Sequence, residues 1–337
     1  MKKKSSSPTM KDVAALAGVS LGTVSKVINN IPVGDDYRIR VEQAAKTLGY
    51  QVNNYARSLK TNKTNTIAVI MPSASHPFFG LLIDHLTRAI RRRDLNIMLF
   101  LSFFDMEGEQ KCIELVRQNK VDGIIALTYS PDLEIDTSIP FVSIDRYYAS
   151  YVPCISSDNF GGGILAGRKL VNLGCKNLLF VRTGSAVTGE PDKRGIGFEN
   201  YCQANNIPVK SIRLNDADGL VPLKNFLKEH VREKKFEFDG IFCSTDHLAA
   251  TVIRYLNELE IRIPEDVQII GFDGIPRLPG DPPAISTIVQ PVETIAETAV
   301  QTLLSANRSS LPSLTCLPVE YRPGWTTKDG KKRSAED

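Results

Sequence analysis

Two charged residues, Asp273 and Arg194, have the chemistry to hold a small polar ligand. Asp273 directly follows a short apolar run, and Arg194 closes a polar segment that begins where another apolar run ends. A carboxylate and a guanidinium can together fix hydroxyl groups, a carboxylate or the edge of a polar ring. Further polar and aromatic residues follow other apolar runs in the same way. They are Ser73, His76, Phe78, Phe79, Asp145 and Thr245.

The elements that would position these residues are strands alternating with amphipathic helices from residue 66 onward. The expected strands are 67–71, 97–101, 123–127, 141–144, 178–181, 240–243 and 267–272. The expected helices are roughly 78–93, 107–118, 161–173, 194–206, 221–234 and 246–259. This alternation predicts an α/β fold with parallel sheets, and the chain length suits two lobes. Ligands of such sheets bind beyond the carboxyl ends of the strands, so we expect the candidate residues to line one cleft.

Plainer interpretations of these residues remain open. Asp273 could simply end a strand or cap a helix, and Phe78 or Phe79 could belong to the core. The chain has no His-rich metal cluster and no Walker lysine. The three glycines 161–163 lack the Lys-Ser/Thr of a phosphate loop and are expected at a helix entry. We therefore expect no catalysis, no metal and no cofactor.

The run 9–29 has the pattern of two short helices joined by a tight turn. Val13, Leu16 and Ala17 recur at helical spacing, and Gly18 supplies the turn. Two helices at this spacing fit the major groove of DNA. A pair of ordinary core helices is the alternative.

Four sequence segments carry a family resemblance. Ala-Ala-Leu-Ala-Gly-Val-Ser at 14–20, Thr-Val-Ser-Lys-Val at 23–27, Leu-Gly-Tyr at 48–50 and Asn-Asn-Tyr-Ala-Arg-Ser-Leu-Lys at 53–60 resemble the lactose-repressor (LacI/GalR) family of transcriptional regulators. The resemblance implies a helix-turn-helix DNA-binding domain at 1–62 with a hinge helix at about 53–60. It also implies a two-lobed, periplasmic-binding-protein-like core at 63–337 for effector binding and dimerisation.

The resemblance also implies which residues meet DNA. Leu21, Gly22 and Lys26 occupy the base-facing positions of the second helix, and Lys26 can donate to guanine. Thr23, Ser25 and Asn29 are expected to contact phosphates. In the hinge helix, the implied DNA-contacting residues are Asn53, Ala56, Arg57, Leu59 and Lys60. Leu59 would enter a base step of the minor groove and kink the duplex.

Charge and cysteine usage agree with a DNA-binding regulator. Residues 1–65 carry 11 Lys or Arg against 4 Asp or Glu, although the whole chain has a net charge of only +3. A basic segment of this kind is typical of contact with the phosphate backbone. The six cysteines are scattered without metal-ligand spacing, so reduced core thiols are expected. No apolar stretch suits an export signal or a membrane span, and we expect a cytoplasmic protein.

The resemblance implies a repressor of carbohydrate-utilisation genes that binds a pseudo-palindromic double-stranded operator as a homodimer. The resemblance implies that a small-molecule effector, a sugar or sugar phosphate, binds at Arg194 and Asp273 and switches operator affinity. A purine or nucleoside effector, or a phosphorylated protein co-regulator, remains an alternative. A solute-binding protein or an enzyme is a more distant one.

Overall fold

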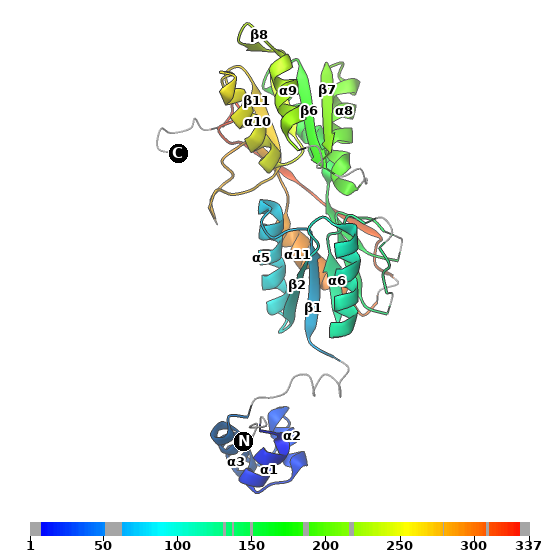
Figure 1. Cartoon of the computed structure of the whole chain (residues 1–337), viewed down its shortest axis with the longest axis vertical. Coiled ribbons are helices and arrows are strands. Elements are labelled where there is room, and N and C mark those ends of the chain that lie inside the picture. The colour runs from blue at the N-terminus through cyan, green and yellow to red at the C-terminus, as the bar shows by residue number, and fades with distance from the viewer. Residues whose placement is uncertain are drawn as a thin grey trace, which may run out of the picture. The chain divides into compact units, whose positions relative to one another are not determined.

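The computed structural model describes residues 8–50, 63–130, 133–136, 138–148, 151–184, 189–215, 219–278, 280–307 and 310–330 (Figure 1). The chain divides into two compact units, Met1–Thr64 and Asn65–Asp337. The boundary predicted after residue 62 and the hinge helix predicted at 53–60 lie in the segment 51–62, which is outside the described residues.

In its described residues, 8–50 and 63–64, the first unit has the helices α1 (Met10–Ala17), α2 (Leu21–Ile28) and α3 (Asp35–Leu48). Thr9 and Asp12 form a capping box at the start of α1, which satisfies backbone N–H groups that the helix itself leaves unpaired. Gly18 ends α1 in the left-handed region, with φ 64°. The buried stripe of α1 runs through Val13, Ala14 and Ala17. Leu16, predicted on that face, lies beyond its edge and is 53% exposed.

The second unit consists of two α/β lobes. The sheet of the first lobe has the strand order β2–β1–β3–β4–β5–β13. Its strands are β1 (Thr66–Met71), β2 (Asn96–Leu101), β3 (Gly123–Ala126), β4 (Phe141–Ile144), β5 (Cys154–Ser157) and β13 (Leu314–Leu317). Helices α5 (Pro77–Arg91) and α11 (Val292–Leu303) cover one face, and α6 (Met106–Asn119) covers the other (Figure 1).

The second lobe repeats this plan with the order β7–β6–β10–β11–β12–β14. Its strands are β6 (Leu178–Gly184), β7 (Val209–Asn215), β10 (Gly240–Cys243), β11 (Gln268–Asp273), β12 (Thr287–Val289) and β14 (Glu320–Arg322). Its helices are α7 (Asn159–Asn172), α8 (Lys193–Ala204), α9 (Val221–Glu229) and α10 (Asp246–Glu258). A short 3₁₀ turn, η1 (Glu190–Asp192), precedes α8. The predicted two-lobed α/β core is confirmed.

Two details of the second lobe differ from the sequence prediction. β14 runs antiparallel to β12, because the chain leaves the carboxyl end of β13 in the first lobe and enters the facing sheet from its own carboxyl edge. The helix predicted at 221–234 ends at Glu229. A small hairpin of β8 (Val231–Arg232) and β9 (Lys235–Phe236) follows it, turning at Glu233 and Lys234, which both have positive φ.

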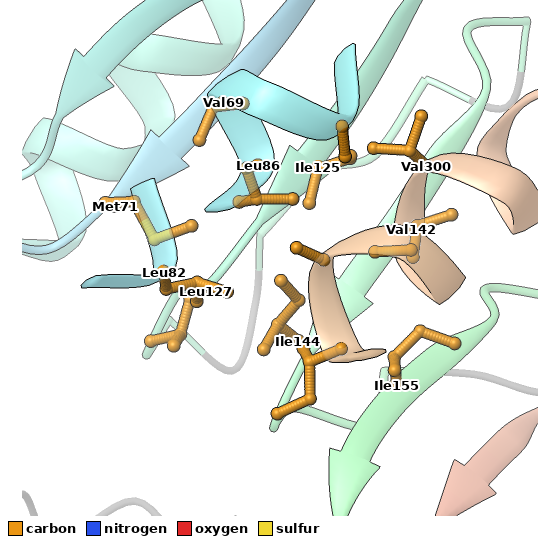
Figure 2. Close-up of a cluster of buried hydrophobic side chains, with 14 of the residues drawn as sticks. Val69, Met71, Leu82, Leu86, Ile125, Leu127, Val142, Ile144, Ile155 and Val300 are labelled. Atoms are coloured by element: carbon orange, nitrogen blue, oxygen red, sulfur yellow. The ribbon is translucent and has the colours of Figure 1, made fainter. Parts of the chain in front are cut away.

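The core of the first lobe lies between its sheet and helices α5 and α11. Val69, Ile125 and Val142 project from the sheet against Leu86 and Val300 from the two helices (Figure 2). Because α11 follows β12 of the second lobe, this packing ties the two lobes into one unit. The prediction that all six cysteines are core thiols is wrong for Cys316, which is exposed on an edge strand.

Candidate functional site

A cavity of about 770 Å³ is lined by both lobes of the second unit. Its walls come from the carboxyl ends of β1, β3 and β4 in the first lobe and of β6, β10 and β11 in the second. This is where ligands bind in open parallel sheets, because the strand order reverses there and the loops separate. The predicted residues that line the cavity are His76, Phe78, Phe79, Asp145, Arg194, Thr245 and Asp273.

Ser73 is the predicted effector residue that does not line the cavity. Its hydroxyl instead lies 2.9 Å from the hydroxyl of Ser75 and accepts from the Ser75 backbone N–H. Thr245 lines the cavity but has a structural task as well. Its hydroxyl accepts from the backbone N–H of Leu248 at 3.1 Å and so caps α10, although it can still donate to a ligand.

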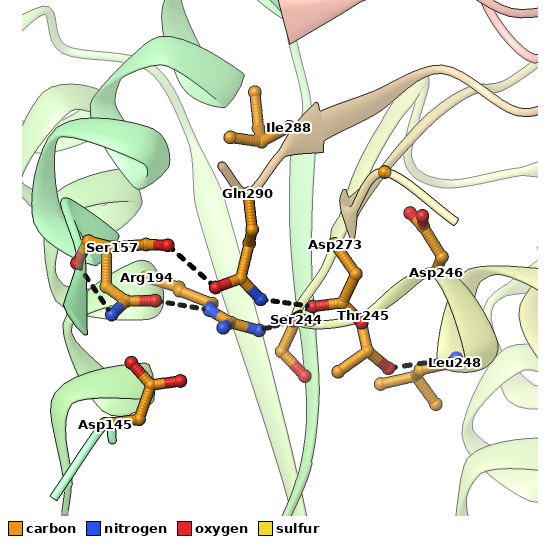
Figure 3. A network of polar contacts seen from close by, with 12 residues as sticks. Asp145, Ser157, Arg194, Ser244, Thr245, Asp246, Leu248, Asp273, Ile288 and Gln290 are labelled. Atoms are coloured by element: carbon orange, nitrogen blue, oxygen red, sulfur yellow. Dashed lines mark hydrogen bonds and ion pairs between the residues drawn. The ribbon is translucent and has the colours of Figure 1, made fainter. Parts of the chain in front are cut away.

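Arg194 is held rigidly in the wall of the second lobe. Its Nε donates to Asn159 at 2.7 Å, and its Nη1 donates to the backbone carbonyl of Ser244 at 2.7 Å (Figure 3). The guanidinium carbon lies 3.8 Å from the ring centroid of Phe272, a cation–π contact inside the protein. Because Arg194 is only 4% exposed, these contacts fix the orientation of the remaining donor nitrogen before any ligand arrives.

Asp273 faces Arg194 with one oxygen engaged and one unpaired. Its Oδ1 accepts from Gln290 at 2.8 Å and lies 3.5 Å from Nη1 of Arg194 (Figure 3). Its Oδ2 is buried and has no hydrogen-bond partner among the described residues. Burial raises the pKa of Asp273 to about 6, against the opposing effect of Arg194. Asp273 is thus a carboxyl group with a raised pKa and with one oxygen that has no partner among the described residues.

Two further buried aspartates surround this pair. Asp145 accepts from the hydroxyl of Ser156 at 2.7 Å, and burial raises its pKa. Asp246 accepts from the hydroxyl of Thr287 at 2.6 Å, and its pKa is also raised, first by burial and then by the charge of Asp273. Asp145 is therefore a candidate ligand contact, whereas the oxygens of Asp246 are used to hold the turn after β11.

The backbone at Asp145 and Asp273 supports a functional role for both. Their φ angles are 55° and 124°, in the region that side chains other than glycine rarely adopt. Such a conformation costs of order 1–3 kcal/mol and is retained mainly where the site requires it. Sequence reasoning selected both residues from their positions at strand ends, without access to this strain.

The wall of the first lobe is largely aromatic. His76 precedes α5 and lies with its ring centroid 4.7 Å from that of Phe79. Burial, together with the charges of the nearby His247 and Arg194, lowers the pKa of His76 to about 4, so the ring is neutral at physiological pH. Phe104 and Tyr129 also line this wall, together with the buried Thr128. Sequence reasoning missed these three, although each follows a strand of the sheet.

Arg182 and Asp192 are two more lining residues, and they form an ion pair at 2.5 Å. Arg182 lies in β6 and Asp192 in η1, both within the polar segment 182–194 that the sequence pointed to, but neither was singled out. Among the described residues, no group of three His, Cys, Asp or Glu side chains is placed to hold a metal ion. No helix in the described part of the chain is long and apolar enough to cross a membrane.

The first unit presents the second candidate site on α2. Leu21, Gly22 and Lys26 are exposed on this helix. Thr23 and Ser25 are partly buried.

Several of these polar groups hydrogen-bond within the helix. The Thr23 hydroxyl lies 2.9 Å from that of Ser20, and Asn29 donates to the Ser25 carbonyl at 2.7 Å. The other predicted DNA-contacting residues, Asn53, Ala56, Arg57, Leu59 and Lys60, lie outside the described residues.

Arg40 of α3 stabilises the turn between α1 and α2. Its guanidinium donates to the carbonyl of Ala17 at 2.6 and 3.0 Å and to that of Gly18 at 3.0 Å. These carbonyls end α1 and would otherwise lack partners, and a cation there also complements the helix dipole. The sequence gave no signal for this contact, because it joins residues 22 and 23 positions apart.

Two segments of the chain match known protein families. Residues 9–53 match the model "Bacterial regulatory proteins, lacI family", and residues 168–324 match "Periplasmic binding protein-like domain". The sucrose operon repressor of Pediococcus pentosaceus is 33% identical over 330 residues, which cover 95% of this chain and 99% of that protein. The ribose operon repressor of Halalkalibacterium halodurans is 31% identical, covering 88% of this chain and 89% of that protein.

A solved structure extends the likeness to the fold of nearly the whole chain. The lac repressor dimer bound to operator and the anti-inducer ONPF matches with a TM-score of 0.81 at 21% identity. The match covers 96% of this chain and 99% of that one.

Proposed function

The chain belongs to the LacI family of bacterial regulatory proteins, and we propose that it represses carbohydrate-utilisation genes in response to a sugar or sugar phosphate. Membership of a family of transcriptional regulators confirms the prediction of a DNA-binding regulator rather than an enzyme. The observation that carries the proposal is the presence in one chain of a capped two-helix DNA-binding motif and a cavity lined by two lobes.

We assign the operator contacts as the resemblance implies. Leu21, Gly22 and Lys26 face the bases, and their exposure on α2 supports this assignment. Thr23, Ser25 and Asn29 contact phosphates and fix the register of α2 in the groove. In the hinge, Leu59 enters a minor-groove step while Asn53, Ala56, Arg57 and Lys60 lie along the groove and the backbone. One head reads only a few base pairs, so a homodimer binds a pseudo-palindrome, and the protein acts in the cytoplasm, where its operator is.

The effector binds the cavity between the lobes. Arg194 and Asp273 hold its hydroxyls, with Asp145 and Thr245 adding hydrogen bonds and His76, Phe78 and Phe79 forming the opposite wall. The unpaired acceptor oxygen of Asp273 and the fixed guanidinium of Arg194 support this arrangement. The names of the sucrose and ribose operon repressors support a sugar. Binding changes the relative orientation of the lobes and so the ordering of the two hinge segments, which changes operator affinity.

Selection of DNA from a random library with the full-length chain tests the regulator directly. The expected product is a pseudo-palindrome, whose two halves are read by two copies of α2. Substituting Lys26→Met should relax the selected base at one position in each half. Lys11→Met, which removes one charge from α1, is the matched control and should leave the sequence unchanged. Enrichment of unrelated sequences by the wild type would contradict the proposed operator recognition.

A further inference from the structure

The first-lobe wall of the cavity carries a continuous row of rings. The ring of Phe104 lies 6.0 Å from that of Phe79 and 5.8 Å from that of Tyr129, measured between centroids. His76 extends the row, 4.7 Å from Phe79. The four residues come from three separate segments, the start of α5, the loop before α6 and the loop after β3, and all of them line the cavity. A sugar ring presents C–H groups on one face, and the electron-rich faces of such a row are suited to hold it.

The backbone before α6 is bent in an unusual way where it brings Phe104 into this row. Phe103 and Phe104 are consecutive residues with φ of 56° and 60°, a conformation that large side chains rarely adopt. Phe103 is 74% exposed and does not line the cavity, whereas Phe104 does. Strain of this kind is typical of segments that position a functional group, and here the positioned group is the Phe104 ring.

Three residues that line the cavity, from both lobes, each carry a buried polar atom without a partner in the described part of the chain. The hydroxyl of Thr128 in the first lobe, and the hydroxyl of Ser244 and Oδ2 of Asp273 in the second, have no hydrogen-bond partner in the described part of the chain. All three side chains are at least nine-tenths buried, and all three residues line the cavity. Buried polar groups are nearly always satisfied, so these atoms indicate a ligand with hydroxyl groups along its length.

The charges of the second-lobe wall argue against a phosphorylated ligand. Arg182 is paired with Asp192 and Arg194 with Asp273, so neither guanidinium faces the cavity without a carboxylate beside it. Asp145 and Arg146 add one more carboxyl group and one more guanidinium to the same cavity, so the aspartates and arginines that line it are equal in number. A phosphate dianion would therefore meet no excess of positive charge, while the hydroxyls of a neutral sugar can donate to the carboxylates.

We propose that the cleft takes an uncharged glycoside of at least two sugar rings. One ring is held by Arg194, Asp273 and Ser244, and the other lies against Phe104 and Tyr129, with Thr128 bonding to it. The volume of about 770 Å³ lies in the upper part of the range for small-molecule sites, roughly 300–1,000 Å³, and exceeds the needs of a single hexose. This inference rests on the proposed sugar-responsive function and specifies which class of sugar binds.

Calorimetric titration of the full-length protein tests the inference. The probes are sucrose, maltose and cellobiose, their constituents glucose and fructose, and glucose 6-phosphate. At least one disaccharide should bind tenfold or more tightly than its constituents and than glucose 6-phosphate. Phe104→Ala should weaken disaccharide binding tenfold or more and change monosaccharide binding less than twofold. Phe103→Ala is the matched control, because it alters the adjacent residue of the same strained turn outside the cavity, and it should bind as the wild type does.

The outcomes separate this inference from the function on which it rests. Tighter binding of glucose 6-phosphate or of a monosaccharide, or equal losses in the two variants, would overturn the inference and leave a sugar-responsive repressor standing. Failure of every carbohydrate, with nucleosides or purines binding instead, would overturn both. Circular dichroism and retained operator binding of Phe104→Ala check that the variant is folded.

Discussion

The side-chain amide of Gln290 donates to Asp273 at 2.8 Å. Asp273 is the last residue of β11, in the second lobe. Gln290 follows β12, and its carbonyl oxygen accepts from the hydroxyl of Ser157, at the end of β5 in the first lobe, at 2.8 Å (Figure 3). One buried amide therefore connects the end of a first-lobe strand with the carboxylate proposed to hold the effector. The Gln290 side chain therefore contacts both the first lobe and the residue proposed to bind the ligand.

Gln290→Leu should destabilise the protein by about 1–3 kcal/mol, because it leaves Oδ1 of Asp273 and the Ser157 hydroxyl without this buried partner. Urea unfolding followed by circular dichroism measures the change. Gln203→Leu, an exposed glutamine of α8, is the control and should change the free energy of unfolding by less than about 0.5 kcal/mol. Equal effects of the two substitutions would show that the bridge does not contribute to stability.

Effector affinity should fall as the pH is lowered from about 7.5 to about 5. In the free protein the pKa of Asp273 is raised to about 6, so its carboxylate becomes protonated over this interval. A ligand hydroxyl donates to the ionised form, and each pH unit below the pKa weakens binding by up to about tenfold. His76, with a pKa of about 4, stays neutral throughout. Calorimetric titration at several pH values measures this, and Asp273→Asn should bind weakly with little pH dependence.

The same raised pKa has an opposite consequence for the unliganded protein. The folded state keeps the Asp273 proton up to about pH 6, whereas the ordinary pKa of the side chain is 3.8. The contribution of this group to stability is therefore full below about pH 4 and is lost as the pH rises through about 6.

The affinity prediction has its own contradicting outcome. If the affinity of the wild type for the effector does not vary between pH 5 and 7.5, Asp273 is not an ionised ligand contact.

Gly163→Ala should shift Arg194 and weaken effector binding. Helices α7 and α8 pack so closely that a Cβ on Gly163 would lie 2.0 Å from the backbone carbonyl oxygen of Arg194. Forcing the helices apart should cost about 1–3 kcal/mol in the free energy of unfolding. Gly80→Ala in α5, where the nearest atom would be 3.4 Å away, is the control and should be neutral or stabilising by up to about 1 kcal/mol. Thermal unfolding measures the stability of both variants, and titration with the sugar measures their effector binding. Gly163→Ala should show both losses and Gly80→Ala neither.

Arg40→Met should reduce operator affinity while leaving effector affinity unchanged. The substitution removes the hydrogen bonds to the carbonyls of Ala17 and Gly18. Hydrogen bonds from a charged donor contribute about 1.5–3 kcal/mol to stability, and this is an upper bound here because Arg40 is partly exposed. Lys46→Met on the same helix removes one exposed charge without such bonds and serves as the control. Fluorescence anisotropy on the selected operator should give the larger loss for Arg40→Met, and equal losses would indicate that only the charge matters.

Much of the fold could be predicted because its signals are local. Strands such as β4 and β10 are short apolar runs, and their predicted bounds agree with the structure. The ends of α1 follow from Thr9 and Gly18, whose capping roles depend only on neighbouring residues. The strands that the sequence did not reveal, β5, β7, β8, β9 and β12 to β14, include edge strands whose polar or mixed residues give weak periodicity.

The cleft was predictable to the extent that it follows from one topological rule. Asp145 and Asp273 end strands, and the rule that ligands bind beyond strand ends brings them into the same cavity. Residues whose role depends on tertiary contact were missed. Phe104 owes its place to two consecutive left-handed residues, and Arg40 to a contact between α3 and the end of α1. Neither feature can be recognised from the spacing of residues in the sequence or from its composition.

The most direct test of the account measures operator affinity with and without a saturating concentration of the sugar that binds most tightly. Wild type should change its operator affinity by about 5- to 150-fold, the usual range of coupling between two sites. Arg194→Lys keeps the charge but loses the forked donors to Asn159 and Ser244, so it should bind the operator as the wild type does and fail to respond. A variant that responds to the sugar as fully as the wild type would contradict the claim that this cavity controls DNA binding.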